Sequence, residues 1–238
     1  MIQNRVNHRA ALLVLPILLI SLASVHANAQ AGSAKPGIND KFLSDELDIE
    51  VWTKRFEGES RQIYAHRNEI VAALRLEDKQ RVADIGAGTG FFSELIAQAV
   101  GPNGLVWALE ISPKFIEHMR DRFAKADLQQ IEVVENTDRT TGLGRASIDL
   151  AFICDVYHHF EYPDAMLENL THVLRPGGSL IIVDFERIEG KSTDFIMNHV
   201  RAGKAVFRKE IEEAGFLYKE EIKIEGLEDN YILRFTRR

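Results

Sequence analysis

The 238-residue chain has a single cysteine, only six prolines and no excess of positive charge. With Cys154 alone, no intrachain disulfide can form, so the stability must come from a hydrophobic core. Lysine and arginine total 29 against 36 acidic residues and are scattered along the chain, which argues against nucleic acid and anionic membrane surfaces as partners. No internal repeat or low-complexity block divides the chain, and its length suits one α/β domain.

Long apolar runs are also scarce, and the one present lies at the N-terminus. Ala10 to Val25 is almost wholly apolar, follows Arg5 and Arg9, and precedes the cleavage pattern Ala27-Asn28-Ala29. This order predicts a secretory signal peptide over residues 1–29 and a periplasmic mature protein. Its removal takes away two arginines and no acid, which moves the formal charge from −7 to −9. A retained membrane anchor is the alternative, although Pro16 interrupts the run and the run is shorter than the roughly 20 residues of a spanning helix.

Beyond a linker at residues 30–38, the hydrophobic spacing predicts a single domain over residues 39–238. Helical spacing at 40–57 and 60–75 comes first. Strands are then expected at 81–85, 105–109, 131–134, 148–153 and 179–184, with helices at 91–100, 113–125, 163–174 and 204–214. Two β-like runs, 216–225 and 230–236, follow with a short turn between them and must pair antiparallel. The alternation predicts an α/β fold with a mostly parallel sheet and helices on both faces.

The most informative stretch is a glycine-rich turn that follows the first strand. Asp84 ends that strand, and glycines stand at alternate positions from Gly86 to Gly90. A turn without side chains lets a ligand lie against backbone N–H groups and the positive end of the next helix. The dinucleotide pattern G-x-G-x-x-G would need glycine where this chain has Phe91, which weakens a nicotinamide cofactor as an interpretation.

The pattern from Asp84 to Gly90 resembles motif I of the class I S-adenosylmethionine-dependent methyltransferases. The stretch Asp155 to Phe160 and the turn Arg175-Pro176-Gly177-Gly178 are similar to the methyltransferase-11 type, so the resemblance covers about residues 60–236. It implies a three-layer Rossmann-like fold, with a seven-stranded sheet whose last strand is antiparallel. It also implies S-adenosyl-L-methionine as cofactor, with its amino acid end held by Asp84, Gly86, Ala87, Gly88 and Gly90.

The rest of the cofactor site is expected at the ends of the second and third strands. Glu110 ends the second strand, where a carboxylate can accept two hydrogen bonds from the ribose hydroxyls. By the resemblance, Ile111 lies beside the adenine, and Asp138 or Thr137 meets the adenine amino group. This segment departs from the Gly-Asp-Ala pattern common in the family, and a solvated loop is the alternative.

Residues after the fourth strand are the candidates for chemistry, because ligands in such sheets sit beyond the carboxyl ends of the strands. Asp155 is expected to contact cofactor or substrate. His158 or His159 is the candidate base, since histidine titrates in the useful range, and Tyr157 is a candidate for orienting the acceptor. The alternative for the histidines is packing or helix capping. On the same rim His199 and Arg201 are candidates for substrate selection, with solvated loop residues as the alternative. We assign no metal ligand from the sequence.

The sequence therefore favours an exported enzyme that transfers a methyl group from S-adenosylmethionine to a small-molecule or lipid-like acceptor. Three alternatives stay open: a catalytically silent S-adenosylmethionine-binding protein, a protein isoaspartyl-type methyltransferase and a nicotinamide-dependent oxidoreductase. The segment 100–106 resembles the turn of the isoaspartyl family, but the catalytic segment that the family carries before motif I is not evident here. The methylated atom and the oligomeric state have no signature in the sequence.

Overall fold

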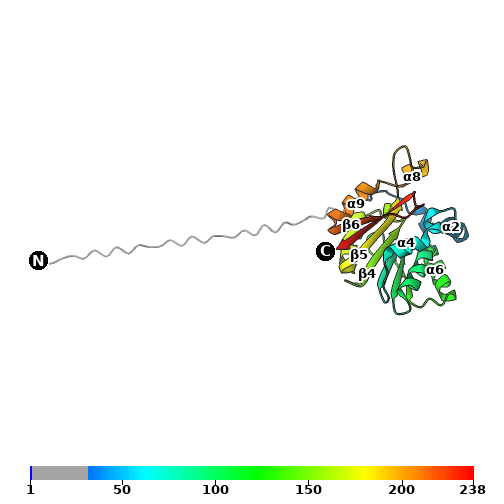
Figure 1. Ribbon diagram of the computed structural model, residues 1–238, viewed down its shortest axis with the longest axis horizontal. Helices are drawn as coiled ribbons and strands as arrows, with labels where there is room; N and C mark the ends of the chain where they lie inside the picture. The colour runs from blue at the N-terminus through cyan, green and yellow to red at the C-terminus, as the bar shows by residue number, and fades with distance from the viewer. Residues whose placement is uncertain (2–31) are drawn as a thin grey trace. The chain divides into compact units, whose positions relative to one another are not determined.

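A seven-stranded sheet forms the centre of the structure, a computed structural model that describes Met1 and residues 32–238 (Figure 1). Its strands are β1 (Arg81–Ile85), β2 (Leu105–Glu110), β3 (Ile131–Glu135), β4 (Ile148–Cys154), β5 (Leu174–Phe185), β6 (Phe216–Ile222) and β7 (Asn230–Arg237). The strand order is β3-β2-β1-β4-β5-β7-β6, with β7 antiparallel to both of its neighbours and the other pairs parallel. The predicted α/β fold is confirmed. The predicted signal peptide, apart from Met1, lies outside the described residues.

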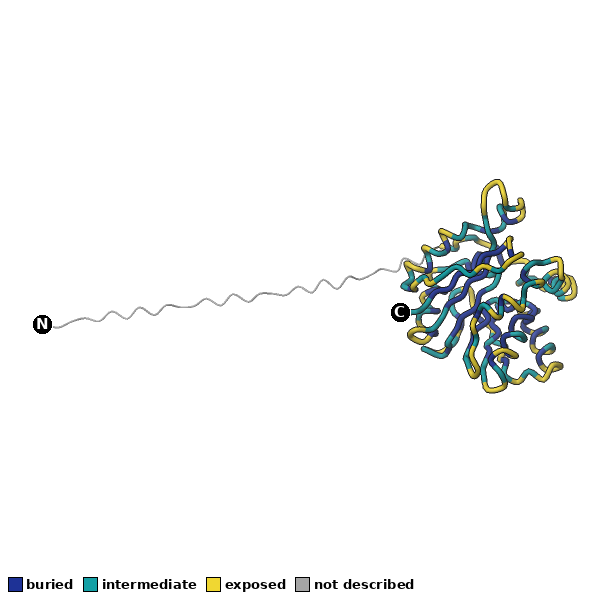
Figure 2. Tube along the Cα trace, in the orientation of Figure 1, coloured by how far each residue is buried: buried dark blue, intermediate teal, exposed yellow. Residues whose placement is uncertain are grey.

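The central strands are buried on both faces, as parallel strands under crossover helices must be (Figure 2). Successive side chains alternate between the faces: Ala83 and Ile85 belong to one hydrophobic cluster, and Val82 belongs to the other. Asp84 shares the face of Val82, so its carboxylate is drawn into the core at the end of β1. This placement matters for the site described below.

Helices cover both faces of the sheet. They are α1 (Asp40–Leu43), α2 (Ile49–Phe56), α3 (Gln62–Ala65), α4 (Arg67–Leu74), α5 (Phe91–Val100), α6 (Pro113–Lys125), α7 (Pro163–Val173), α8 (Asp194–His199) and α9 (Lys204–Glu213). Helices α4, α5 and α6 pack their apolar residues into one cluster, and α7, α8 and α9 pack theirs into the other. None of the helices in the described part of the chain is both long and apolar enough to cross a bilayer.

The segment before α1, expected as a linker, makes contacts with the domain. Ser33 Oγ donates to the Glu161 carboxylate over 2.7 Å, and the backbone N–H of Ala34 donates to the Glu161 carbonyl. Ile38 is buried. These contacts hold the chain entry close to the carboxyl ends of the parallel strands, where β4 has just ended.

Three local features differ from the expectations. The predicted helices 40–57 and 60–75 are each broken in two, because Asp48 caps α2 and His66 separates α3 from α4. The turn Arg175 to Gly178 is a bulge within β5, since the pairing with β4 steps from Leu174 to Ser179. Helix α8 was not predicted, because a six-residue helix is too short to give a clear periodic pattern.

Candidate active site

A cavity of about 380 Å³ opens at the carboxyl ends of β1 and β4, the neighbouring strands at which the strand order reverses. This volume lies within the roughly 300–1,000 Å³ usual for small-molecule sites. The cavity brings together most of the predicted site residues: Asp84, Gly86, Ala87, Gly88, Glu110, Ile111, Thr137, Asp138, Asp155, His158, His159 and His199. Gly90, Tyr157 and Arg201 do not line it.

Asp84 lies at the inner end of the cavity and is almost completely buried. Ser93 Oγ donates a hydrogen bond of 2.6 Å to its Oδ2. Burial raises the pKa of Asp84 to about 7, although the bond from Ser93 acts in the opposite direction. A cationic ligand group brought into the cavity would stabilise the ionised carboxylate.

Glu110 ties the glycine-rich turn to the end of β2. Its Oε2 accepts from the backbone N–H of Gly88 over 2.9 Å, and its Oε1 accepts from Ile111 and Ser112 over 2.8 and 3.0 Å. Burial raises the pKa of this carboxyl despite the three bonds. A carboxylate has about four acceptor positions, so capacity remains for a ribose hydroxyl.

The turn itself corrects one expectation, that its N–H groups are free for a ligand. The N–H groups of Gly86 and Ala87 both donate to the Leu109 carbonyl, over 2.8 and 2.9 Å, and Gly88 donates to Glu110. Their hydrogen bonds hold the turn against β2 before any ligand is present. What the turn offers a ligand is therefore a preformed surface on which only Ala87 and Thr89 carry side chains.

Two of the glycines are required by close packing at positive φ. A Cβ on Gly86, at φ +72°, would lie 2.5 Å from Val156, and one on Gly90, at φ +83°, would lie 2.6 Å from Phe123. A side chain at position 90 would therefore clash with α6. Gly90 does not line the cavity, and its contact with the cofactor stays a prediction.

The loop after β3 carries Thr137 and Asp138, the residues predicted to contact the adenine. Thr137 and Asp138 line the cavity but are exposed, and Thr137 Oγ1 accepts from the N–H groups of Arg139 and Thr140 within its own loop. Asn136, which no sequence pattern singles out, is buried and lines the cavity, and its Oδ1 has no hydrogen-bond partner within Met1 and residues 32–238. An unpartnered amide oxygen suits an amino group of a ligand.

Asp155 reaches the cavity, but it is already paired. Its Oδ2 accepts from Arg61 and its Oδ1 from Asn230 Nδ2, each over 2.6 Å. Burial raises its pKa, and the nearby Arg61 guanidinium opposes this. Asp155 has a positive φ of 52°, a strained backbone for a residue other than glycine and common at ligand sites. Arg61 and Asn230 were missed, because no motif marks them.

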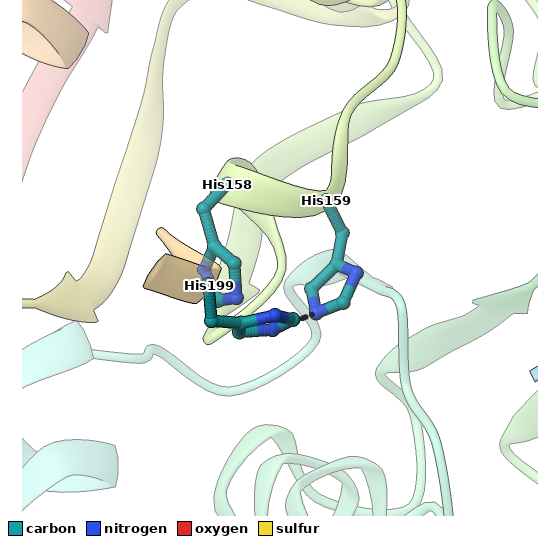
Figure 3. A group of neighbouring side chains, drawn as sticks. All are labelled: His158, His159 and His199. Atoms are coloured by element: carbon teal, nitrogen blue, oxygen red, sulfur yellow. Dashed lines mark hydrogen bonds between the residues drawn. The ribbon is translucent and has the colours of Figure 1, made fainter. Parts of the chain in front are cut away.

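Three histidines from two elements meet at the other end of the cavity (Figure 3). His158 and His159 lie in the short helical turn that follows β4, and His199 ends α8. Burial lowers the pKa of His159, and the neighbouring imidazoles lower it further; burial likewise lowers the pKa of His199 to about 4. Both imidazoles are therefore neutral near pH 7.

Tyr157 is not at the site, which corrects the expectation that it orients an acceptor. The ring is completely buried and packs against Phe160 and Phe207, and its hydroxyl donates to Glu210 over 3.0 Å. Arg201 donates to the same carboxylate over 2.6 and 2.7 Å. In the turn Tyr157–His159 the tyrosine faces the core and the histidines face the cavity.

An aromatic wall lines one side of the cavity. It is formed by Phe42, Trp52 and Phe56 of the N-terminal segment with Phe115 of α6, whose rings lie 4.9 to 6.2 Å from one another where they contact. Phe56 lies against the Gly88 position. Lys41 and Arg55 line the same cavity and lie over the Trp52 ring, at 5.1 and 5.0 Å.

The sequence of the central segment matches a known family. Residues 83–180 match the model of a methyltransferase domain. The ubiquinone/menaquinone biosynthesis C-methyltransferase UbiE of Bordetella parapertussis is 29% identical over 108 residues, which cover 45% of this chain and 42% of that protein. The demethylmenaquinone methyltransferase of Listeria monocytogenes is 28% identical over 120 residues, half of each chain. This chain thus spans half or less of the length of these curated relatives.

Solved structures agree on the fold. A SAM-dependent methyltransferase from Aquifex aeolicus superposes with a TM-score of 0.71 at 18% identity, over 81% of this chain and 100% of that one. The CurJ carbon methyltransferase superposes with a TM-score of 0.61 at 18% identity, over 82% of this chain and 60% of that one.

The superpositions show a Rossmann-like methyltransferase fold, and residues 83–180 match a methyltransferase domain. S-adenosyl-L-methionine is its cofactor. The site fits this group, because buried carboxylates at Asp84 and Glu110 flank the glycine-rich turn, and the Asn136 Oδ1 beside them has no hydrogen-bond partner among the described residues.

Proposed function

We propose that the protein transfers the methyl group of S-adenosylmethionine to a small, largely apolar or lipid-like acceptor. The observation that carries this proposal is the continuity of one cavity. The same space is lined by Asp84 and Glu110, by the aromatic wall and by the three histidines. A nucleoside and an apolar acceptor therefore have room side by side.

The cofactor supplies an electrophilic methyl group on a cationic sulfur. The acceptor atom forms a bond to this carbon as the carbon–sulfur bond breaks, which leaves a neutral thioether and releases one proton from the acceptor. Such an in-line displacement depends mainly on alignment and exclusion of water. The aromatic wall excludes water, and Glu110 with the turn fixes the nucleoside. His158 and His159 stay the predicted bases for the proton.

Carbon is the acceptor atom that the relatives favour. UbiE is named a C-methyltransferase of quinone biosynthesis and CurJ a carbon methyltransferase. Carbon becomes nucleophilic next to an ionised oxygen, as in a phenolate or an enolate. Lys41 and Arg55 place positive charge on the cavity wall, which suits an acceptor with such an oxyanion.

Incubation of the purified chain with labelled cofactor and a panel of phenols, quinols and β-dicarbonyl compounds tests the transfer. The proposal expects a product heavier by one methylene unit, together with the demethylated cofactor. Binding of S-adenosylmethionine without turnover on any acceptor would favour the silent binding protein. Methylation confined to peptides containing isoaspartate would favour the repair alternative, and preference for a nicotinamide dinucleotide would favour the oxidoreductase.

We further propose that residues 1–29 direct the protein to the periplasm. The support is the sequence pattern alone: Arg5 and Arg9, the apolar run and the Ala27-Asn28-Ala29 site. N-terminal sequencing of the protein recovered from a periplasmic extract is expected to begin near Gln30. A mature protein that still begins at Met1 and stays with the cytoplasmic or membrane fraction would contradict this.

A further inference from the structure

The three histidine side chains converge on one point of the cavity. The ring centroids of His158 and His159 are 4.4 Å apart, and the His199 ring lies 5.0 and 4.9 Å from them (Figure 3). One ring nitrogen from each residue lies within 4.8 Å of the other two. Figure 3 shows the three rings turned toward one another from the two elements that carry them.

In His158 and His159, the ring nitrogen that points away from the cluster is Nδ1, and it lies against an oxygen acceptor. His158 Nδ1 lies 2.8 Å from Asp184 Oδ1, and a carboxylate there requires Nδ1 to carry the proton. His159 Nδ1 lies 3.1 Å from Asn39 Oδ1, and the amide of Asn39 also donates to the His159 carbonyl. With Nδ1 held in this way, the Nε2 atom of each ring is the one that faces the cluster. Carboxylate or amide oxygens behind histidines are the usual support of metal ligands.

The Nε2 atoms of the three rings face one another inside the cluster. His158 Nε2 is buried, in a side chain that is 1% exposed, and has no hydrogen-bond partner in the part of the chain that the structure describes. His159 Nε2 and His199 Nε2 lie 3.2 Å apart. In a tetrahedral site with metal–nitrogen bonds of about 2.0–2.1 Å, two ligand nitrogens are separated by about 3.3 Å. The spacing of this pair already matches such a site.

We infer that His158, His159 and His199 bind one divalent transition-metal ion, with zinc as the best fit, and leave a fourth coordination position open to the cavity. Three imidazole ligands suit zinc and its neighbours rather than calcium or magnesium, which prefer oxygen ligands. Asp184 and Asn39 orient two of the ligands and are positioning residues. The cluster was not apparent from the sequence, because His199 is 40 residues away from His159.

Metal binding would replace the general-base role predicted above for His158 and His159, because the same lone pairs would hold the ion. A base needs one imidazole nitrogen aimed at the acceptor, whereas here three inner nitrogens face one another. The acceptor role of the ion rests on the proposed function: the open position would bind the acceptor oxygen and lower its proton affinity, so that the proton leaves to solvent before methyl transfer. This explains how a weakly acidic phenol or enol becomes nucleophilic beside the neutral histidines.

Metal binding is tested on the full chain, purified without a polyhistidine tag, stripped with a chelator and titrated with Zn²⁺ in a calorimeter. We expect one site per chain. Co²⁺ in its place is expected to give the intense visible absorption of a four-coordinate site. His199→Ala, in the least buried ligand, is expected to weaken Zn²⁺ binding by at least about tenfold, and Asp184→Asn by about 10–100-fold. His172→Ala, an exposed histidine on α7, is the matched control and should bind Zn²⁺ as the wild type does.

Folding is checked by thermal melts of each variant, and S-adenosylmethionine affinity is measured on the same samples. Absence of a saturable Zn²⁺ site in the wild type, or equal affinity in wild type and His199→Ala, would overturn the metal proposal. If S-adenosylmethionine binds and Zn²⁺ does not, the metal proposal fails and the proposed function stands. If Zn²⁺ binds and S-adenosylmethionine does not, the metal proposal stands and the proposed function fails.

Discussion

The Glu110 carboxylate accepts a hydrogen bond of 2.9 Å from the backbone N–H of Gly88, 22 residues earlier in the chain. One side chain thus shapes the glycine-rich turn and keeps an acceptor position that we predict for a ribose hydroxyl. A change in Glu110 should then affect both the turn and the binding of the cofactor.

Glu110→Gln is therefore expected to weaken binding of S-adenosylmethionine by about 10–100-fold, since hydrogen bonds to a charged group contribute about 1.5–3 kcal/mol each. Isothermal titration calorimetry measures the change. Glu135→Gln, at the exposed end of the neighbouring strand β3, is the matched control and should leave the affinity unchanged. Equal affinities of Glu110→Gln and wild type would remove Glu110 from the cofactor site.

Asp84 makes the stability of the ligand-free protein depend on pH. Its pKa in the fold, about 7, is above its ordinary value of 3.8, so the folded state favours the protonated form. Its contribution is full below pH 3.8 and is lost as the pH rises through about 7. Denaturant unfolding is measured from about pH 5 to about pH 8, a range that includes the pKa of Asp84 in the fold. The free energy of unfolding should fall more steeply with pH in wild type than in Asp84→Asn. If the free energy of unfolding changed with pH in the same way in both proteins, the raised pKa of Asp84 would be refuted.

Cofactor binding should reverse this preference, because an ammonium group near Asp84 favours the ionised carboxylate. Below pH 7, the protein must release a proton to bind, so the affinity of wild type is expected to rise with pH, up to about tenfold per unit. In Asp84→Asn the affinity should be lower and independent of pH over the same range. Calorimetry in buffers of different ionisation enthalpy counts the released protons; no proton release in wild type would contradict the prediction.

Arg61 and Asp155 join the N-terminal segment to the end of β4 over 2.6 Å, with 25% and 8% of their side chains exposed. Arg61→Met is expected to destabilise the fold by about 1–3 kcal/mol, because a mostly buried carboxylate loses its cation. Lys125→Met breaks an exposed pair with Asp121 and should cost under about 1 kcal/mol. Chemical denaturation compares them, and equal effects of the two substitutions would show that the Arg61 pair is not a structural link.

The substitution Tyr157→Phe tests whether the Tyr157 hydroxyl stabilises the fold or orients the acceptor, as its place in the sequence suggests. The lost hydrogen bond to Glu210 should lower the unfolding free energy by about 1 kcal/mol. Cofactor affinity and turnover should match wild type, because the hydroxyl points away from the cavity. A large loss of turnover with unchanged stability would return Tyr157 to the active site.

The sequence predicts the fold well because the fold depends on local patterns. The buried strands show as short apolar runs, and the turn at Gly86 and Gly88 has a spacing that few alternatives share. The placement of Glu110 at a strand end beside the cavity follows from the topology. The packing of Gly90 against Phe123 could not be predicted, because the two residues are far apart in the sequence.

The other half of the cavity depends on contacts between distant segments. Asn39 meets His159 and Arg61 meets Asp155, separated by 120 and 94 residues, and no local spacing records such pairs. His158 and Tyr157 are adjacent, and their opposite directions are set by the short helical turn after β4. Asn136 was passed over in favour of Asp138 because the family pattern directs attention to an acid.

The most direct test is a calorimetric titration of the purified full chain with S-adenosylmethionine, repeated with its demethylated product and with a nicotinamide dinucleotide. We predict saturable binding of the first two at one site per chain, weakened in Glu110→Gln and retained in Glu135→Gln. No heat with S-adenosylmethionine, or tighter binding of the dinucleotide, would contradict the account.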